Sequence, residues 1–242
     1  MLSKAKIKFI KSLQIKKYRK QEQCFLVEGA KSVHELLDSD FELVTLLGTS
    51  DFLSGLNRSI KCEVIEVSVK ELEGLGDFQT NDTTLAIARQ RLNNPIDVLP
   101  DEFALVLDDI KDPGNLGTII RTADWFGIQK IIASAETADF YNSKVITSSM
   151  GSFTRTRIFY TDLEEFLSKN RLKVFGAYLS GSDVHKTDFG TGGLIVMGNE
   201  SKGISPSLEK YITDKITIPR YGKAESLNAA IATAIICDNI RR

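Results

Sequence analysis

The stretch FALVLDDIKDPGNLGTIIRTADWFG, residues 103–127, contains the change of pattern that decides the fold. A continuous apolar run, FALVLD, leads into the turn residues Asp112-Pro113-Gly114. After the turn, apolar residues recur at helical spacing until Gly127, a typical helix stop. The residues expected to face the core are Leu116, Ile119, Ile120, Ala123 and Phe126. The stretch therefore predicts a buried strand, a tight loop and a helix capped by Asn115.

The loop between this strand and helix is of a kind that often binds phosphate. It contains neither G-x-x-x-x-G-K-[ST] nor G-x-G-x-x-G, the patterns that hold nucleotide phosphates. A dehydrogenase or an NTPase is therefore disfavoured. Arg121, inside the helix, has no evident structural task. A surface salt bridge is the simplest alternative to a functional role for it.

Bulk composition is that of an ordinary globular protein with one large domain or two small ones. The chain has 242 residues, of which 42% are hydrophobic and 26% charged. Its apolar runs are too short to span a bilayer, and residues 1–20 lack the apolar core of a signal peptide. Cys24, Cys62 and Cys237 are isolated and have no clustered histidines nearby. We therefore expect a cytoplasmic protein with no membrane association and no metal.

The net charge is -1, but basic residues gather at the beginning of the chain. Residues 1–20 contain eight basic side chains and no acid: Lys4, Lys6, Lys8, Lys11, Lys16, Lys17, Arg19 and Lys20. Such a basic arm can bind RNA phosphates even when the whole chain is nearly neutral. The alternative is the solvated face of a helix whose buried stripe is Leu2, Ile7, Ile10 and Leu13. Charge alone leaves both interpretations open.

The pattern of elements predicts two domains, residues 1–93 and residues 103–242, with a linker at 94–102. In the first, helical spacing covers 26–39, and short strands are expected at 41–48, 62–67 and 84–90. In the second, strands are expected at 103–108, 130–134, 157–160, 173–179, 194–198 and 215–219. Helices are expected at 161–170, capped by Thr161 or Asp162, at 205–213 and at 226–240. This alternation predicts an α/β fold with a mostly parallel sheet covered on both faces.

Two further segments of the second domain have ligand-site character. GNESKGI, residues 198–204, directly follows a buried strand, and ligands of open α/β sheets bind at that edge. Glycine there lets a ligand approach the backbone, although a plain tight turn is the alternative. IPRYGKAESLNAA, residues 218–230, leads into the last helix, with Ser226 as the expected cap. The alanines on several faces of that helix indicate close packing, in the core or at a subunit interface.

Together, DPGNxGxxxRTAxxFG, GNExxGI and IP-x(6)-SLNAAxAxAI resemble, in this order, the three motifs of the SpoU family of RNA ribose 2′-O-methyltransferases. This family belongs to the SPOUT class, and the resemblance covers residues 103–242. KxxRxQEQCFLVEGAKSVHELL, residues 16–37, resembles the family's substrate-binding domain, which is related to a ribosomal-protein fold. The segment Gln79–Thr84 departs from the Thr-x-x-Gln-Gly-like segment of many relatives.

The resemblance implies a SPOUT domain with a deep trefoil knot, plus a small N-terminal RNA-binding domain. It also implies a homodimer that binds S-adenosylmethionine in the knot. Contacts to the cofactor are expected from Gly198, Ile218, Leu227, Tyr178, Leu179 and Ser180. Ile218 and Leu227 suit an apolar slot for adenine, and Gly198 admits the edge of the ligand.

The resemblance places catalysis on five residues: Asn115, Arg121, Glu200, Ser226 and Asn228. The reaction implied is in-line attack of a ribose 2′-oxygen on the methyl group. An arginine base has been proposed for the family, but lowering a guanidinium pKa from ~13 to ~7 would cost about 8 kcal/mol. We therefore expect Arg121 to hold RNA phosphate, Ser226 and Asn228 to hold the hydroxyl or the donor, and Glu200 to organise its loop. Ribosomal RNA is favoured over transfer RNA, and an inactive RNA-binding relative is the alternative.

Overall fold

The computed structural model describes residues 2–77 and 81–242. Contacts divide the chain into two compact units. The first contains residues 1–92 together with 139–154, and the second contains 93–138 and 155–242. The chain thus returns to the first unit after it has begun the second, a return that the predicted boundary at 94–102 does not include.

The first unit is built on a mixed four-stranded sheet. Its strands, in spatial order, are β1 (Cys24–Glu28), β4 (Thr84–Arg89), β2 (Leu43–Gly48) and β3 (Glu63–Glu66). Only β2 and β3 are parallel. The expected helix over 26–39 is wrong at its start, because β1 extends to Glu28 and helix α3 covers Ala30–Leu37. All five residues of β1 are buried, and a strand buried on both faces lacks the alternation that reveals strands in sequence.

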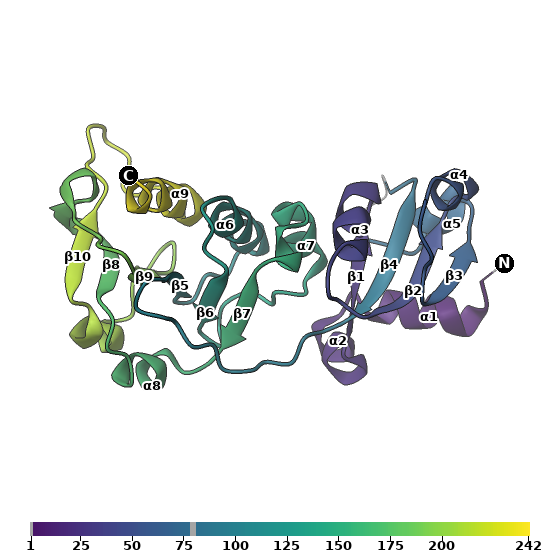
Figure 1. Cartoon of the computed structure of the whole chain (residues 1–242), viewed down its shortest axis with the longest axis horizontal. Helices are drawn as coiled ribbons and strands as arrows, with labels where there is room; N and C mark the ends of the chain where they lie inside the picture. The colour runs from purple at the N-terminus through teal and green to yellow at the C-terminus, as the bar shows by residue number, and fades with distance from the viewer. Residues whose placement is uncertain (1, 78–80) are drawn as a thin grey trace. The chain divides into compact units, whose positions relative to one another are not determined.

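Helices cover both faces of this sheet (Figure 1). The helices of the first unit are α1 (Lys4–Ser12), α2 (Lys16–Glu22), α3, α4 (Ser50–Ser54), α5 (Val69–Glu73) and α7 (Ser143–Ser149), with the short helix η1 (Ser152–Thr154). Ile10 and Leu13 are fully buried in one core with Leu26, Leu85 and Ile87. The stripe predicted for residues 1–20 is therefore a buried stripe, with most of the charges outside it.

Residues 139–154 pack on the side of β1 that carries Phe25. The ring of Tyr141 lies 4.7 Å from that of Phe25, and the ring of Phe153 lies 6.1 Å from it. Helix α7 also packs on β1. Neither α7 nor this packing was expected from the sequence, because the seven residues SKVITSS carry no clear helical stripe.

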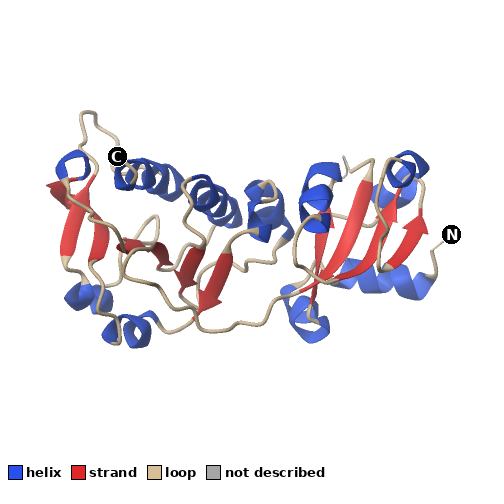
Figure 2. Ribbon diagram, viewed as in Figure 1, coloured by secondary structure: helices blue, strands red, loops and turns tan. Residues whose placement is uncertain are grey.

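The second unit contains a six-stranded sheet in which every strand pair is parallel (Figure 2). Its spatial order is β10 (Asp214–Thr217), β8 (Val174–Asp183), β9 (Gly193–Met197), β5 (Phe103–Leu107), β6 (Lys130–Ala133) and β7 (Arg157–Tyr160). The predicted α/β fold with a mostly parallel sheet is confirmed. The trefoil knot stays a prediction.

Helices α6 (Pro113–Trp125) and α9 (Ala229–Ile240) pack together on one side of this sheet, and α8 (Leu163–Ser168) and η3 (Pro206–Tyr211) lie on the other (Figure 1). A further short helix, η2, covers Val184–Lys186. The segment expected as an α-helix at 205–213 is the 3₁₀ helix η3.

Three expected caps can be compared with the structure. Asp162 caps α8 as predicted. Asp112, not Asn115, caps α6, because its side chain accepts the N–H of Asn115. Asn228, not Ser226, caps α9 and accepts the N–H groups of Ala230 and Ile231.

The expected lack of membrane spans and the segment 79–84 can now be considered. Within the described ranges, no helix is long and apolar enough to cross a membrane. Gln79 and Thr80, which belong to the departing segment 79–84, lie outside the described residues.

Candidate active site

A cavity of about 1100 Å³ lies in the second unit where β9 and β10 end. Three separate segments line it. They are 177–180 of β8, 197–204 from the end of β9, and 216–222 with 224–227 from the end of β10 onward, together with residues of α9. In a parallel sheet, strand ends of one kind meet at the same edge, which explains the convergence of segments distant in sequence.

All six residues predicted to contact the cofactor line this cavity: Gly198, Ile218, Leu227, Tyr178, Leu179 and Ser180. Burial raises the pKa of the Tyr178 phenol, and the Lys215 ammonium lies 4.9 Å from the centre of its ring. Leu179 is 80% exposed and Leu227 is 48% exposed. The cavity therefore has apolar surface ready for a ligand, although the assignment of each residue stays a prediction.

Gly198 is required by the backbone around the cavity. A Cβ atom at this position would lie 2.2 Å from the carbonyl carbon of Gly203 and 2.3 Å from the nitrogen of Ile204. No side chain fits at such distances, because the clash is with backbone and not with a movable side chain. This close approach folds the loop after β9 back on itself at the cavity wall.

Asn199 holds that loop in shape. Its backbone N–H and carbonyl pair with Gly203 at 3.0 and 2.9 Å. Its side-chain Oδ1 accepts the N–H groups of Ser201 and Lys202, and its Nδ2 donates to the carbonyl of Asp109 at 2.8 Å. Asn199 was not among the predicted site residues, although an Asn directly after the strand-ending glycine is a typical turn-forming signal.

Asp109 is a second residue of the site that was not predicted from the sequence. Its φ is 59°, in the left-handed region, and its N–H donates to Ser134 Oγ. One carboxylate oxygen, Oδ1, is buried and has no hydrogen-bond partner within residues 2–77 and 81–242. Asp tolerates this backbone conformation better than most residues, so position 109 joins the β5 end to the loop of Asn199 without needing glycine.

Three of the five predicted catalytic residues form one hydrogen-bonded group. Asn115 Nδ2 donates to Glu200 Oε1 at 2.7 Å, and Asn228 Nδ2 donates to Asn115 Oδ1 at 2.8 Å. The group joins α6, the loop after β9 and the start of α9. The structure therefore brings together residues that are up to 113 positions apart.

The other two predicted catalytic residues lie outside this group. Ser226 lines the cavity and is exposed. Arg121 is exposed on α6 and does not line the cavity. In the described parts of the chain its side chain has no ion-pair or hydrogen-bond partner, so the surface salt bridge considered as its alternative role is not formed there.

The donor set of this site suits an organic cofactor. It combines the apolar side chains Ile218 and Leu227 with the close backbone approach at Gly198. Among the described residues, no group of three or more His, Cys, Asp or Glu side chains is placed to hold a metal ion.

Two models of known protein families match the chain. The model of the SpoU rRNA Methylase family matches residues 102–238, and that of the MRM3-like substrate binding domain matches residues 4–86. The chain belongs to the SpoU rRNA methylase family. The predicted family and the predicted class of S-adenosylmethionine-dependent RNA 2′-O-methyltransferase are confirmed.

Individual SpoU relatives resemble the chain over its full length. It is 29% identical to the 23S rRNA (guanosine(2553)-2′-O)-methyltransferase RlmP of Bacillus subtilis, over 98% of this chain and 96% of that protein. A TrmH-family putative RNA methyltransferase from Porphyromonas gingivalis superposes with a TM-score of 0.91 at 36% identity, covering 99% of this chain and 98% of the other. AviRb of Streptomyces viridochromogenes, solved with AdoMet, superposes with a TM-score of 0.88 at 25% identity, covering 98% and 97%.

Proposed function

We propose that this protein transfers a methyl group from S-adenosylmethionine to a ribose 2′-hydroxyl of 23S ribosomal RNA. One observation carries the proposal: the residues Asn115, Glu200 and Asn228 form a single group beside a cavity that all six candidate cofactor residues line. The full-length likeness to RlmP, a 23S rRNA methyltransferase, supports the choice of ribosomal over transfer RNA.

The cavity suits the cofactor by its shape and its chemistry. Ile218 and Leu227 offer apolar contact for the adenine ring, and the absence of a side chain at Gly198 lets the edge of a ligand approach the cavity wall. S-adenosylmethionine supplies a sulfonium-activated methyl group, so the protein's main contribution is to orient the attacking oxygen. The predicted knot would enclose these same segments.

Arg121 is the residue we assign to the RNA. A guanidinium is too basic to accept the proton of the ribose, since lowering its pKa from ~13 to ~7 would cost about 8 kcal/mol. It is well suited to hold phosphate through two parallel hydrogen bonds. Its exposure and its lack of a partner among the described residues leave it available for RNA.

Glu200 and Ser226 complete this division of roles. Glu200 accepts a hydrogen bond from Asn115, which suits a residue that organises the loop after β9. Ser226 and Asn228 lie at the N-terminus of α9, where they would hold the ribose hydroxyl or the methyl donor.

The experiment that tests this assignment is Arg121→Ala, with Arg171→Ala as a control at another exposed arginine of the same unit. Methyl transfer to 23S rRNA should fall at least ~100-fold, the typical effect of removing one preorganised donor. The dissociation constant of S-adenosylmethionine, measured by calorimetry, should not change. Equal loss of cofactor binding and of transfer would contradict the assignment. An unaltered protein that binds the cofactor but methylates no RNA would favour the alternative of an inactive RNA-binding relative.

A homodimer in the cytoplasm is the second part of the proposal. Ile231 on α9 is 52% exposed, Leu227 is 48% exposed and Tyr221 is 97% exposed. Apolar side chains are therefore exposed around the N-terminus of α9. Burial of this surface against a second copy would stabilise the protein. Light scattering should give twice the 26.9 kDa chain mass, and Ile231→Asp should shift the mass toward one chain. A monomeric unaltered protein at micromolar concentration would contradict this part.

A further inference from the structure

Six lysines of α1 and α2 are exposed. They are Lys4, Lys8, Lys11, Lys16, Lys17 and Lys20, which we call the lysine surface. In the described ranges none of them has an acidic partner, and Lys17 lies 6.0 Å from the centre of the Tyr18 ring. The two other basic residues of this region are occupied, since Lys6 pairs with Glu63 and Arg19 pairs with Asp139. The structure thus separates a surface set of charges from an internal set.

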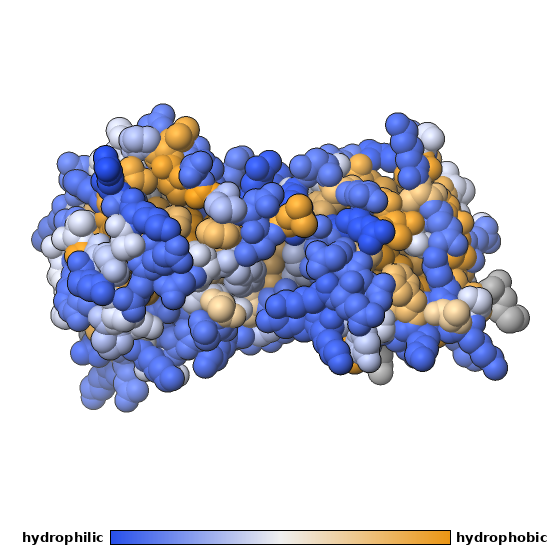
Figure 3. All heavy atoms as spheres, turned by 90° about the horizontal axis from the view of Figure 1, so that it is seen from below, coloured by the Kyte–Doolittle hydropathy of each residue, from blue (hydrophilic) through white to orange (hydrophobic). Residues whose placement is uncertain are grey.

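Helical spacing gathers the lysine surface on the solvent side of each helix. On α1, Lys4, Lys8 and Lys11 follow one another at steps of four and three residues, away from the buried Ile10. On α2, Lys16 and Lys20 are four residues apart with Lys17 between them, away from the buried Arg19. Figure 3, seen from the side on which α1 and α2 lie, shows hydrophilic side chains interspersed with hydrophobic ones over the first unit.

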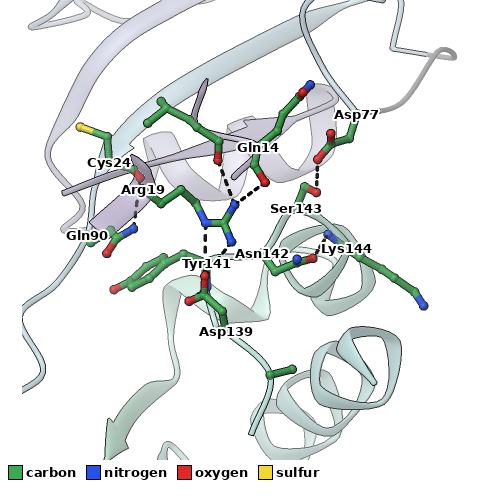
Figure 4. Close-up of polar contacts among 12 residues, drawn as sticks. Gln14, Arg19, Cys24, Asp77, Gln90, Asp139, Tyr141, Asn142, Ser143 and Lys144 are labelled. Carbon is green, nitrogen blue, oxygen red and sulfur yellow. Dashed lines mark hydrogen bonds and ion pairs between the residues drawn. The ribbon is translucent and has the colours of Figure 1, made fainter. Parts of the chain in front are cut away.

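Arg19 hydrogen-bonds the turn between the two helices to Asp139 (Figure 4). Its side chain is 3% exposed, and its Nη1 donates to the carbonyls of Leu13 and Gln14 at 2.9 and 2.8 Å. Its Nη2 and Nε donate to Asp139 Oδ2 at 2.7 and 3.2 Å. Gln14 Nε2 donates to the Leu75 carbonyl at 3.2 Å. These hydrogen bonds fix the backbone that carries the lysines. Less conformational entropy is then lost when a partner binds.

Neighbouring ammonium groups repel one another, so the lysine surface destabilises the free protein. A bound polyanion would remove this repulsion. Tyr18 is 38% exposed and Ile15 is 54% exposed at the same helices, which adds an aromatic ring and apolar contact between the charges. Lysines around an exposed aromatic ring suit RNA, whose phosphates pair with ammonium groups and whose unpaired bases stack on rings.

We propose that the lysine surface of α1 and α2 binds the phosphate backbone of the ribosomal RNA substrate. The proposal rests on the proposed function, because it names the surface by which the substrate of the catalytic unit is held. This surface contributes affinity for RNA, whereas Arg121 contributes to methyl transfer.

The test compares two triple variants with a matched control. The first variant is Lys4→Gln, Lys8→Gln and Lys11→Gln; the second is Lys16→Gln, Lys17→Gln and Lys20→Gln. The control is Lys31→Gln, Lys61→Gln and Lys70→Gln, which removes the same charge from exposed positions of the same unit outside α1 and α2. The probe is transcribed 23S rRNA, with binding measured by filter retention from 50 to 300 mM salt.

Each surface variant should weaken RNA binding about tenfold at 150 mM salt. Each phosphate contact contributes ~0.7–0.9 to the slope of log Kobs against log salt, so the loss of three lysines should reduce the magnitude of that slope by about 2. KM for RNA should rise, while kcat, the affinity for S-adenosylmethionine and the thermal midpoint should stay as in the unaltered protein. An unchanged salt slope, or an equal loss in the control, would overturn the proposal. Binding is read without catalysis, so an unaltered protein that binds RNA through these lysines but methylates none would count against the proposed function alone.

Discussion

At the candidate site, one amide side chain both donates and accepts hydrogen bonds that join remote segments. Asn115 donates to Glu200 and accepts from Asn228, so one amide joins two other segments of the chain. Aspartate at this position would lack the donor and would place a second carboxylate against Glu200. The amide is therefore a requirement of the geometry, independent of any role in the chemical step.

Tyr141 offers a residue-scale prediction about stability and pH. Burial raises the pKa of its phenol from 10.0 to about 12, and its oxygen accepts the Arg91 N–H at 2.8 Å. Below pH 10 the phenol is neutral in both the folded and the unfolded chain, so its full contribution is present. Between pH 10 and 12 the unfolded chain loses the proton first, and up to about 3 kcal/mol of folding free energy is lost.

Tyr141→Phe should remove that pH dependence. At pH 8 the variant should be less stable by about 1 kcal/mol, because the Arg91 N–H loses this acceptor. At pH 11.5 the variant should equal or exceed the unaltered protein. Urea unfolding at both pH values measures the difference, and a constant gap between the two proteins would contradict the assignment.

At the scale of elements, the loop after β9 is held by backbone contacts that leave no space for a side chain at Gly198. Gly198→Ala should therefore open the loop and weaken the binding of S-adenosylmethionine at least tenfold, with methyl transfer falling in parallel. Gly222→Ala is the control, because Gly222 lines the same cavity and a Cβ there meets nothing within 4 Å. Calorimetry on both variants makes the comparison, and equal affinities would show that this approach is not needed for the cofactor.

Several elements could be predicted from the sequence because local patterns report them. β5, α6 and β9 were expected near their observed places, since apolar runs and helical spacing survive without tertiary information. β1 was mistaken for helix because it is buried on both faces, and α7 was missed because its packing, and not its pattern, makes it a helix. Within the site, Asn199 and Asp109 were missed because their importance comes from contact with each other across 90 residues.

At the scale of the whole molecule, the chain leaves its second unit and returns to the first through residues 139–154. Asp139 begins this return and pairs with Arg19, whose side chain is 3% exposed (Figure 4). Removing one member of a buried pair leaves the other charge uncompensated, which usually costs more than the pair itself contributes.

Arg19→Met should therefore lower the free energy of unfolding by about 3–5 kcal/mol. Arg19→Met combined with Asp139→Asn should recover part of the loss. Arg58→Met is the control, because Arg58 also pairs with an aspartate, Asp38, but both side chains are exposed, and such a pair contributes about 0–1 kcal/mol. Urea unfolding compares the three variants, and a loss for Arg19→Met no larger than that for Arg58→Met would show that the buried pair does not hold the return in place.

The sequence by itself determined the α/β class, the parallel sheet of the second unit and the membership in a methyltransferase family, because these follow from local periodicity and from short motifs in a set order. Only the tertiary structure decided that Asn115, Glu200 and Asn228 bond to one another, that residues 139–154 belong with the first unit, and that Lys6 and Arg19 form ion pairs. The reason is physical: hydrogen bonds and burial depend on distances between segments remote in the chain, and no pattern within one segment contains them.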